Sequence, residues 1–216
     1  MKSTTLLVAA AALAVEAISA GAQVYSANVV GYVNVVFTNN NNFVLASNPL
    51  DDGTNTANSI LAALPNKSSI QTWNGSTFDL ASKGSSGFTP NPSIPPGAGF
   101  FVKVAGTSVV TNTFVGNVVP NPGGNSTNSL PSGTFVLVGS ALAVGGTLND
   151  VGTNALNLIA TLPNKSSIQL WDVASQSFVL SSKGSSGFTP NLPYVVGQGF
   201  FLKSNSATNW VQSFAP

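Results

Sequence analysis

The sequence predicts an all-β protein of two tandem β-rich repeats, each a sandwich-like or barrel-like unit of about five strands and one short helix. Two observations predict this class. The first is a duplication, because LPNKSSIQ stands at residues 64–71 and 162–169, and KGSSGFTPN at 83–91 and 183–191. The second is a series of short Val, Ile, Leu and Phe runs separated by turn-forming Gly, Asn, Ser and Pro. Together they favour repeats over residues 23–119 and 120–216.

The start of the chain has the pattern of a secretory signal peptide. Lys2 precedes an apolar run at residues 6–15, and Ala20-Gly21-Ala22 follows as a small-residue cleavage site. The run is too short to span a bilayer, and no later stretch is long and apolar enough to do so. We therefore predict a signal peptide at 1–22 and secretion to the periplasm, cell surface or extracellular space, with no membrane span after cleavage.

Each repeat is expected to begin with a Val-rich strand, at residues 29–37 in the first repeat and 114–119 in the second. A second strand containing FVL follows at 43–50 and 135–142. The first strand is apolar on both faces, so it is expected to need a neighbour. Three neighbours are open to it: the FVL strand of its own repeat, a strand at 210–214, or a strand of another molecule.

One short helix follows in each repeat. Apolar residues recur at i, i+3, i+4 and i+7 from Ala57 and again from Ala155, which is the spacing of one helix face. Thr56 and Asn154 are the predicted N-caps, and Pro65 and Pro163 lie just beyond the helices.

A hairpin comes next, because β-prone runs flank Asn74-Gly75, a strong two-residue turn signal. That turn places Trp73 opposite Ser76 and puts Trp73 on one face with Phe78, which favours a buried tryptophan. The GFF strands follow, and in them Phe100 and Phe101 point to opposite faces. One of these two rings is therefore expected under a loop or at an interface. A Thr-rich strand ending at Phe114 or Phe214 closes each repeat.

The composition excludes several classes of function. Cysteine and histidine are absent, which removes the usual zinc, copper and haem ligands, the His-based triads and the Cys nucleophile. Charged residues make up 6% of the chain, so no basic stripe for nucleic acid exists. Asp51-Asp52 fits a turn better than a pair of catalytic carboxylates, which come from separate segments. We predict no enzyme, no metal and no cofactor.

The residues that remain as a candidate ligand or partner surface are aromatic or basic. An exposed tryptophan can stack on a sugar, and Trp210 is the strongest candidate for such a platform. The lysines occupy matched positions in the two repeats, so they either face a ligand or are copies left by duplication. The candidate surface comprises Trp210, Trp73, Trp171, Lys83, Lys183, Lys103 and Lys203.

Several motifs carry a resemblance. QVYSANVVGYVNV after the signal, W-N-G and G-x-GFFV resemble a group of secreted two-repeat bacterial proteins over nearly the whole mature chain. The G-x-G-aromatic pattern is also similar to small β repeats attached to surface proteins. The resemblance implies export and tandem repeats, and it implies no active residues.

The expected function is that of a secreted, non-catalytic structural or adhesive protein of the cell surface or extracellular matrix. The alternative is a carbohydrate-binding module that uses exposed Trp. The expected partners are a glycan, another surface protein or a second copy of the chain.

Overall fold

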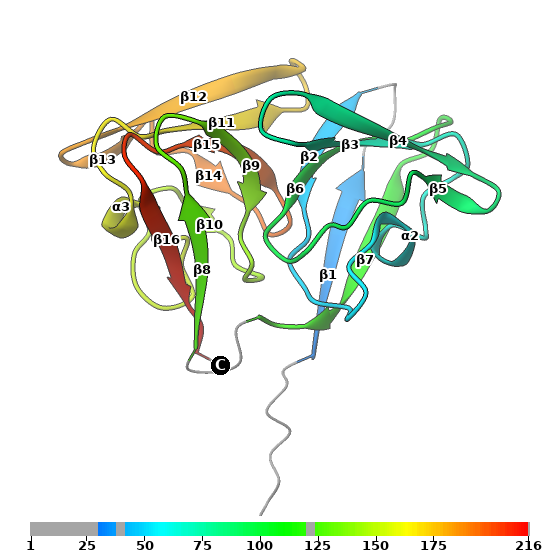
Figure 1. Ribbon diagram of the computed structural model, residues 1–216, viewed down its shortest axis with the longest axis horizontal. Coiled ribbons are helices and arrows are strands. Elements are labelled where there is room, and N and C mark those ends of the chain that lie inside the picture. The colour runs from blue at the N-terminus through cyan, green and yellow to red at the C-terminus, as the bar shows by residue number, and fades with distance from the viewer. Residues whose placement is uncertain (1–29, 38–41, 120–123, 216) are drawn as a thin grey trace, which may run out of the picture.

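The computed structural model describes residues 30–37, 42–119 and 124–215, and the expected signal peptide lies outside the described residues. The fold is nearly all β, with two repeats that each hold a five-stranded sheet and a two-stranded ribbon. In Figure 1 the two sheets lie side by side and the two ribbons lie below them. The prediction of an all-β protein of two tandem repeats is confirmed.

The first repeat has the sheet order β2-β6-β3-β4-β5, and its ribbon pairs β1 with β7. Its elements are β1 (Val30–Phe37), β2 (Phe43–Ser47), α2 (Ala57–Ile60), β3 (Ser69–Trp73), β4 (Phe78–Gly84), β5 (Gly87–Thr89), β6 (Gly99–Lys103) and β7 (Val110–Asn117).

The second repeat has the sheet order β13-β12-β11-β15-β9, with a β16-β8 ribbon and a short β10-β14 pair. Its elements are β8 (Asn125–Leu130), β9 (Phe135–Gly139), β10 (Gly146–Thr147), α3 (Leu158–Thr161), β11 (Ser167–Asp172), β12 (Ser177–Gly184), β13 (Gly187–Thr189), β14 (Pro193–Tyr194), β15 (Gly199–Lys203) and β16 (Thr208–Ser213).

Each repeat has its own core between the sheet and the ribbon. In the first repeat, Ile70, Phe100 and Val102 of the sheet lie in one cluster with Phe37 and Phe114 of the ribbon. In the second repeat, the cluster joins the sheet to the ribbon through Trp210. Since one face of each sheet is covered by a ribbon and a short helix, the opposite face is free for the other repeat.

Three strand predictions need correction. The strand expected at 114–119 is wrong, because Phe114 lies inside β7 of the first repeat and the second repeat begins with β8. β8 reads NSTNSL and buries only Leu130, so it carried no apolar signal. Both neighbours considered for β1 within its own chain, the FVL strand and the strand at 210–214, are also wrong, since β1 pairs with β7 and the strand at 208–213 pairs with β8.

The turns and caps match the expectations only in part. Thr56 is the N-cap of α2, with a capping box to Ser59, as predicted. Asn154 is not a cap, because α3 begins only at Leu158 and its N-cap position is Asn157. The hairpin pairs Trp73 with Phe78 instead of Ser76, because the Asn74 side chain accepts from the amides of Ser76 and Thr77 and closes a longer turn. That shift of two residues keeps the same side chains on the same face.

The two repeats meet around a pseudo-twofold axis. The Ser47 amide donates to Gly197 O at 2.8 Å, and the Gly139 amide donates to Gly97 O at 2.9 Å. Each bond joins the end of an edge strand, β2 or β9, to the segment just before the GFF strand of the other repeat. The same relation holds for the tryptophans, since Trp73 Nε1 donates to Phe135 O at 3.0 Å and Trp171 Nε1 to Phe43 O at 2.8 Å.

Tyr194 is fully buried close to this junction, and its hydroxyl accepts from the Ser140 amide at 2.9 Å and donates to Gln198 O at 2.8 Å. Burial raises the pKa of Tyr194 to about 12 from its ordinary value of 10.0, because the phenolate would be poorly solvated. Below pH 10 the tyrosine is protonated in both the folded and the unfolded chain. Between pH 10 and 12 only the unfolded chain releases this proton, which favours unfolding.

We expect this tyrosine to lower the free energy of unfolding by about 2 to 3 kcal/mol between pH 10 and 12. The measurement is urea unfolding at pH 8, 10, 11 and 12 for the natural chain and for Tyr194→Phe. The variant should be less stable at pH 8, since the Ser140 amide loses its acceptor, but its stability should fall less steeply above pH 10. Equal slopes above pH 10 would contradict the expectation.

Candidate functional site: the aromatic junction of the two repeats

An aromatic cluster fills the junction between the repeats. Its buried members are Leu45 and Phe101 of the first repeat and Leu137 and Phe201 of the second. Half-buried Phe43, Trp73, Phe135 and Trp171 pack around them. One phenylalanine of each GFF strand was expected under a loop or at an interface, and the structure shows the interface, because Phe100 and Phe200 lie in the cores of the repeats while Phe101 and Phe201 lie here.

A cleft of about 260 Å³ opens above this cluster, and we call it the aromatic cleft. Seven residues line it: Phe43, Gln71, Phe78, Phe101, Trp171, Phe178 and Phe201. Phe78 lies 5.7 Å from Phe101 and Phe178 lies 5.6 Å from Phe201, between ring centroids and in edge-to-face geometry. The walls are therefore mostly aromatic side chains held by one another; the polar groups of the lining side chains are the Gln71 amide and the Trp171 indole N–H, which already donates to Phe43 O.

The rim of the aromatic cleft is exposed. Phe78 and Phe178 are 41% and 39% exposed, and Leu80 and Leu180 of the same strands are 55% and 52% exposed. Phe78 and Phe178 line the cleft, and Leu80 and Leu180 follow them on the same faces of their strands, away from the repeat cores. We call these four side chains the rim residues.

Lys103 and Lys203 lie next to this cluster. Lys103 Nζ is 5.6 Å from the centre of the Phe43 ring, and Lys203 Nζ is 5.4 Å from the centre of the Phe135 ring. A cation over a ring face is attracted to its π electrons. These two lysines therefore place positive charge beside the aromatic cluster, and they remain candidates for contact with a partner.

Lys83 and Lys183 have structural contacts instead. Lys83 Nζ donates to the carbonyls of Leu61 and Ala62, at 3.3 and 2.6 Å, where α2 has ended. Burial lowers the pKa of Lys83. Lys183 is buried and its Nζ donates to Asn164 Oδ1 at 3.2 Å. Both lysines hold the start of the repeated KGSSGFTPN segment against its own repeat.

The repeated segment is held by one asparagine in each repeat. Asn58 Oδ1 accepts from the Phe88 amide, and the Asn58 amide donates to Asn91 Oδ1 at 2.9 Å. In the second repeat Asn149 makes the same two contacts, with Phe188 and Asn191. Gly87 has φ +111° and Gly187 has φ +119°, and a Cβ on either would collide with that asparagine. These contacts give the second glycine and the last asparagine of the segment a structural role in both repeats.

The expectation that Trp210 is an exposed platform is wrong, because this side chain is completely buried. Its Nε1 donates to Leu156 O at 2.6 Å and its ring lies 5.7 Å from that of Phe200. On β16 the alternation of side chains directs Trp210 and Gln212 into the core and leaves Asn209 outside. A sugar has no access to this ring.

Trp73 and Trp171 are half-buried, and only Trp171 lines the aromatic cleft. Each ring is already in edge-to-face contact with two phenylalanines: Trp73 with Phe78 and Phe201, and Trp171 with Phe101 and Phe178. The indoles therefore serve first to join the repeats.

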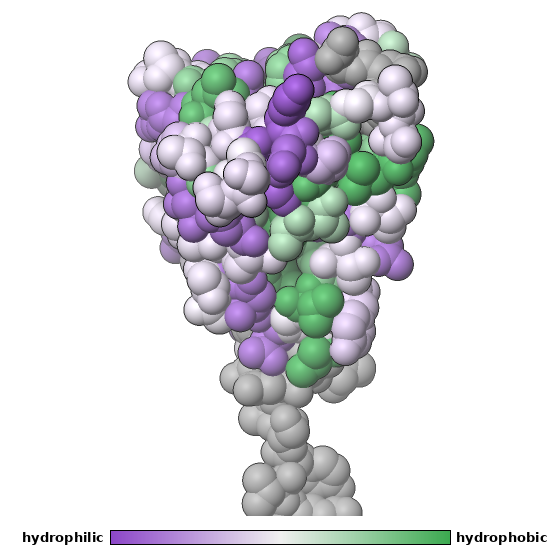
Figure 2. All heavy atoms as spheres, turned by 90° about the vertical axis from the view of Figure 1, so that its right-hand side faces the viewer, coloured by the Kyte–Doolittle hydropathy of each residue, from purple (hydrophilic) through white to green (hydrophobic). Residues whose placement is uncertain are grey.

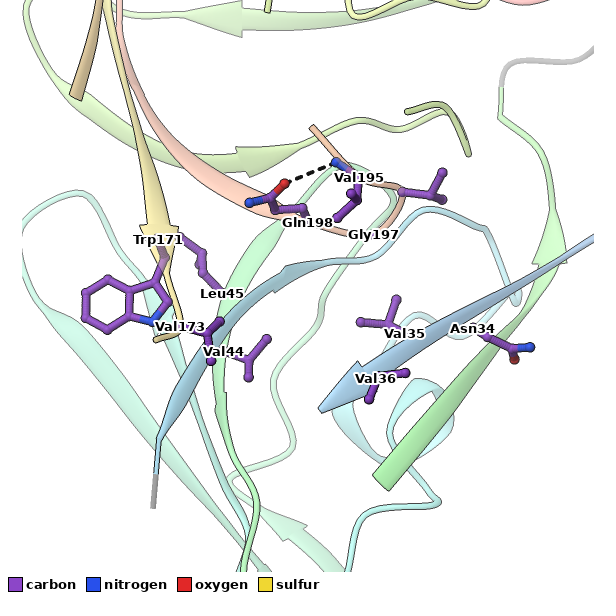
Figure 3. A pocket seen from close by; sticks show the side chains of 11 residues that line it. Asn34, Val35, Val36, Val44, Leu45, Trp171, Val173, Val195, Gly197 and Gln198 are labelled. Atoms are coloured by element: carbon purple, nitrogen blue, oxygen red, sulfur yellow. Dashed lines mark hydrogen bonds between the residues drawn. The ribbon is translucent and has the colours of Figure 1, made fainter. Parts of the chain in front are cut away.

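A second cleft of about 460 Å³ lies between β1, β2 and the second repeat, and we call it the inter-repeat cleft (Figure 3). Its walls come from Asn34–Val36 of β1, from Val44 and Leu45 of β2, from Trp171 and Val173, and from residues 195–198. All of these side chains are uncharged. This cleft was not foreseen, because its walls come from segments far apart in the sequence.

The carboxylates are engaged in turns. Asp51 Oδ1 accepts from the Gly53 amide at 2.8 Å, and Asp52 Oδ1 accepts from the Thr54 amide at 2.8 Å, as expected for a turn. Although partial burial raises it, hydrogen bonds from Ser59, Asn55 and Thr54 together lower the pKa of Asp52. Across residues 30–37, 42–119 and 124–215, no group of three His, Cys, Asp or Glu side chains gathers to hold a metal.

None of the described helices has the length and apolar character needed to cross a membrane. No protein-family model, curated protein or solved structure that was compared with the chain matches it.

Proposed function

We propose that this is a secreted, non-catalytic structural or adhesive protein of the cell surface or extracellular matrix that makes contact through the aromatic cleft and its rim residues. The observation that carries the proposal is the exposure of Phe78 and Phe178, at 41% and 39%, beside an apolar cleft. Binding surfaces characteristically combine exposed apolar residues with aromatic anchors in pockets.

The rigidity of the site supports a binding role. Ring contacts and the two indole hydrogen bonds fix the walls before any partner arrives, so little side-chain entropy is lost on binding. The two lysines beside the cluster add charge at its edge, which suits a partner with an apolar contact group and a polar or anionic margin. A protein or glycoprotein of the cell surface has this chemistry.

The carbohydrate-binding alternative rests on Trp171, the one tryptophan that borders the aromatic cleft. It is weaker than the proposed role, because the ring already contacts Phe101 and Phe178 and, besides the indole N–H that is already hydrogen-bonded, the lining side chains offer a single polar group, Gln71. A sugar site needs several hydrogen-bonding groups besides the stacking ring.

The test is retention of labelled protein on cells or extracted matrix of the source organism lacking the native chain. We expect Phe78→Ser/Phe178→Ser to bind at least about tenfold more weakly than the natural chain, because the two exposed anchors are lost. The matched control is Val109→Ser/Val151→Ser, which removes apolar side chains of 60% exposure outside the cleft and should bind normally.

Equal retention of the natural chain and the Phe78/Phe178 variant, with both folded, would contradict the proposed surface. A glycan array separates the two functions. Binding to a glycan that Trp171→Phe abolishes, with the fold intact, would replace the adhesive proposal with the carbohydrate-binding one.

A further inference from the structure

One edge of β1 is open. Among the described residues β1 pairs with β7 and with no other strand. The Asn117 main chain exchanges hydrogen bonds with Asp51, so its N–H and C=O point away from β1. In the register of the ribbon Asn117 is opposite Val30, so the main-chain groups of Val30 point away from β7. In an antiparallel pair the main-chain groups of successive residues point alternately toward and away from the partner strand. The main-chain groups of Asn34 and Val36 therefore also point away from β7.

This open edge borders the inter-repeat cleft. Three consecutive residues of β1, Asn34, Val35 and Val36, line it, which happens when the edge of a strand and not only one of its faces borders a space. Figure 3 shows β1 with Val35 and Val36 across from Val44 of β2 and below Val195 and Gln198. A strand lying in the cleft would meet unpaired main chain on one side and apolar side chains around it.

The outer face of the β1-β7 ribbon is also apolar. Val30, Tyr32 and Val36 of β1 and Val115 of β7 are 56%, 73%, 53% and 45% exposed. The face of the first repeat shown in Figure 2 likewise carries apolar patches among polar side chains. In the second repeat the corresponding positions of β8 are Asn125, Thr127 and Ser129. The two ribbons thus differ in surface chemistry although they share one fold.

Proteins blunt an open strand edge with a charged residue, a proline or a bulge. β1 has no charged residue and no proline over Val30–Phe37, and its register with β7 is unbroken. A strand kept apolar and open in this way is suited to accept another strand, with main-chain hydrogen bonds for affinity and pockets for alternate side chains.

The chain contains a segment that suits the cleft. Residues 23–29, QVYSANV, have no charge, no Gly and no Pro, and in an extended conformation Tyr25, Ala27 and Val29 share one face. That apolar face matches the uncharged, valine-rich walls of the cleft. With the proposed cleavage after Ala22, this segment becomes the free end of the mature chain.

The segment is too short to fill the cleft of its own molecule. To lie antiparallel beside β1 it must reverse at Asn28-Val29, which pairs Ala27 with Val30 and leaves Gln23 opposite Asn34. An extended residue spans at most about 3.6 Å, so the segment cannot extend to Val36. The segment of another molecule has no such restriction.

We propose that residues 23–29 of a second copy of the chain bind in the inter-repeat cleft as a strand paired with the open edge of β1, which links mature molecules head to tail. This goes beyond the proposed adhesive function and uses a different cleft, which shares only Trp171 with the aromatic cleft. It rests on a mature chain that begins at Gln23, and the test therefore uses recombinant protein made from that residue.

The test separates the donor segment from the acceptor edge. A chain that begins at Val30 lacks the donor. Val36→Pro removes an N–H that points into the cleft without removing a β1-β7 hydrogen bond, and proline is tolerated at such an edge position. The matched control is Ser129→Pro in β8. The Ser129 N–H also points away from its partner strand β16, so this proline removes no hydrogen bond between β8 and β16.

We expect sedimentation velocity to show concentration-dependent association of the natural mature chain and of Ser129→Pro. The truncated chain and Val36→Pro should each remain monomeric. Mixed together they should form a one-to-one dimer and nothing larger, because one supplies only the donor and the other only the acceptor. A labelled peptide of residues 23–29 should bind the truncated chain, and about tenfold more weakly when that chain also carries Val36→Pro.

The proposal is overturned if the mixture remains monomeric, or if the natural mature chain is monomeric at every concentration. It is also overturned if the truncated chain associates as the natural chain does. Should Val36→Pro fail to fold, Val36→Lys takes its place, since this exposed position accepts a lysine and charge blunts a strand edge.

Discussion

Replacing Trp210 with alanine is expected to lower the free energy of unfolding by about 3 to 5 kcal/mol. The side chain is completely buried in the core of the second repeat, between the sheet and the ribbon. Its removal leaves a large cavity and also leaves Leu156 O without the indole that now donates to it at 2.6 Å. Few other single side chains of this molecule combine so much buried volume with a buried hydrogen bond.

The measurement is chemical unfolding of the mature chain followed by circular dichroism. Trp210→Phe is the matched variant, because it keeps most of the side-chain volume while it removes the Nε1 donor. It should therefore lower the free energy of unfolding clearly less than Trp210→Ala does. If the free energy of unfolding of Trp210→Ala is within about 0.5 kcal/mol of that of the natural chain, this ring is not buried in the core.

Trp210 also shows where sequence reasoning fails. Its position near the end of the chain indicated exposure. The structure places it in the core because β16 alternates, with Trp210 and Gln212 inside and Asn209 outside. The short polar strand β8 gave no signal at all, since its inward positions are filled by Ser126, Asn128 and a single leucine. Without β8, the partner of β16 could not be named.

The duplication, in contrast, carried most of what could be predicted. Matched motifs indicate that both repeats share one fold, and alternation in the GFF strands places Phe100 and Phe101 on opposite faces whatever the tertiary structure. Periodicity cannot say what covers the second face. In this protein the other repeat covers that face, with close backbone contacts at glycines such as Gly199. Both the aromatic cleft and the inter-repeat cleft are formed at this junction, so neither can be predicted without it.

Gly199→Ala is expected to lower the free energy of unfolding by about 3 kcal/mol, the upper end of the usual cost of overpacking. A Cβ at this position would lie 2.5 Å from Ala46 O and 3.0 Å from Ala46 C of the other repeat. These are backbone atoms of β2, so no side chain can rotate away. To admit the methyl group, the two repeats must separate, which weakens the bond from the Ser47 amide to Gly197 O and the aromatic cluster beside it.

The control is Gly184→Ala, also in a strand of the second repeat and also without a positive φ, where the nearest atom to the added Cβ is Gly187 O at 3.8 Å. Gly184→Ala should change the free energy of unfolding by no more than about 0.5 kcal/mol. Calorimetry of the natural chain should give one transition, with equal calorimetric and van't Hoff enthalpies, because the junction makes the repeats unfold together. In Gly199→Ala the calorimetric enthalpy should exceed the van't Hoff enthalpy, as the repeats begin to unfold separately. If Gly199→Ala melts like Gly184→Ala, in one transition at the same temperature, then the close backbone contact between the repeats does not hold them together.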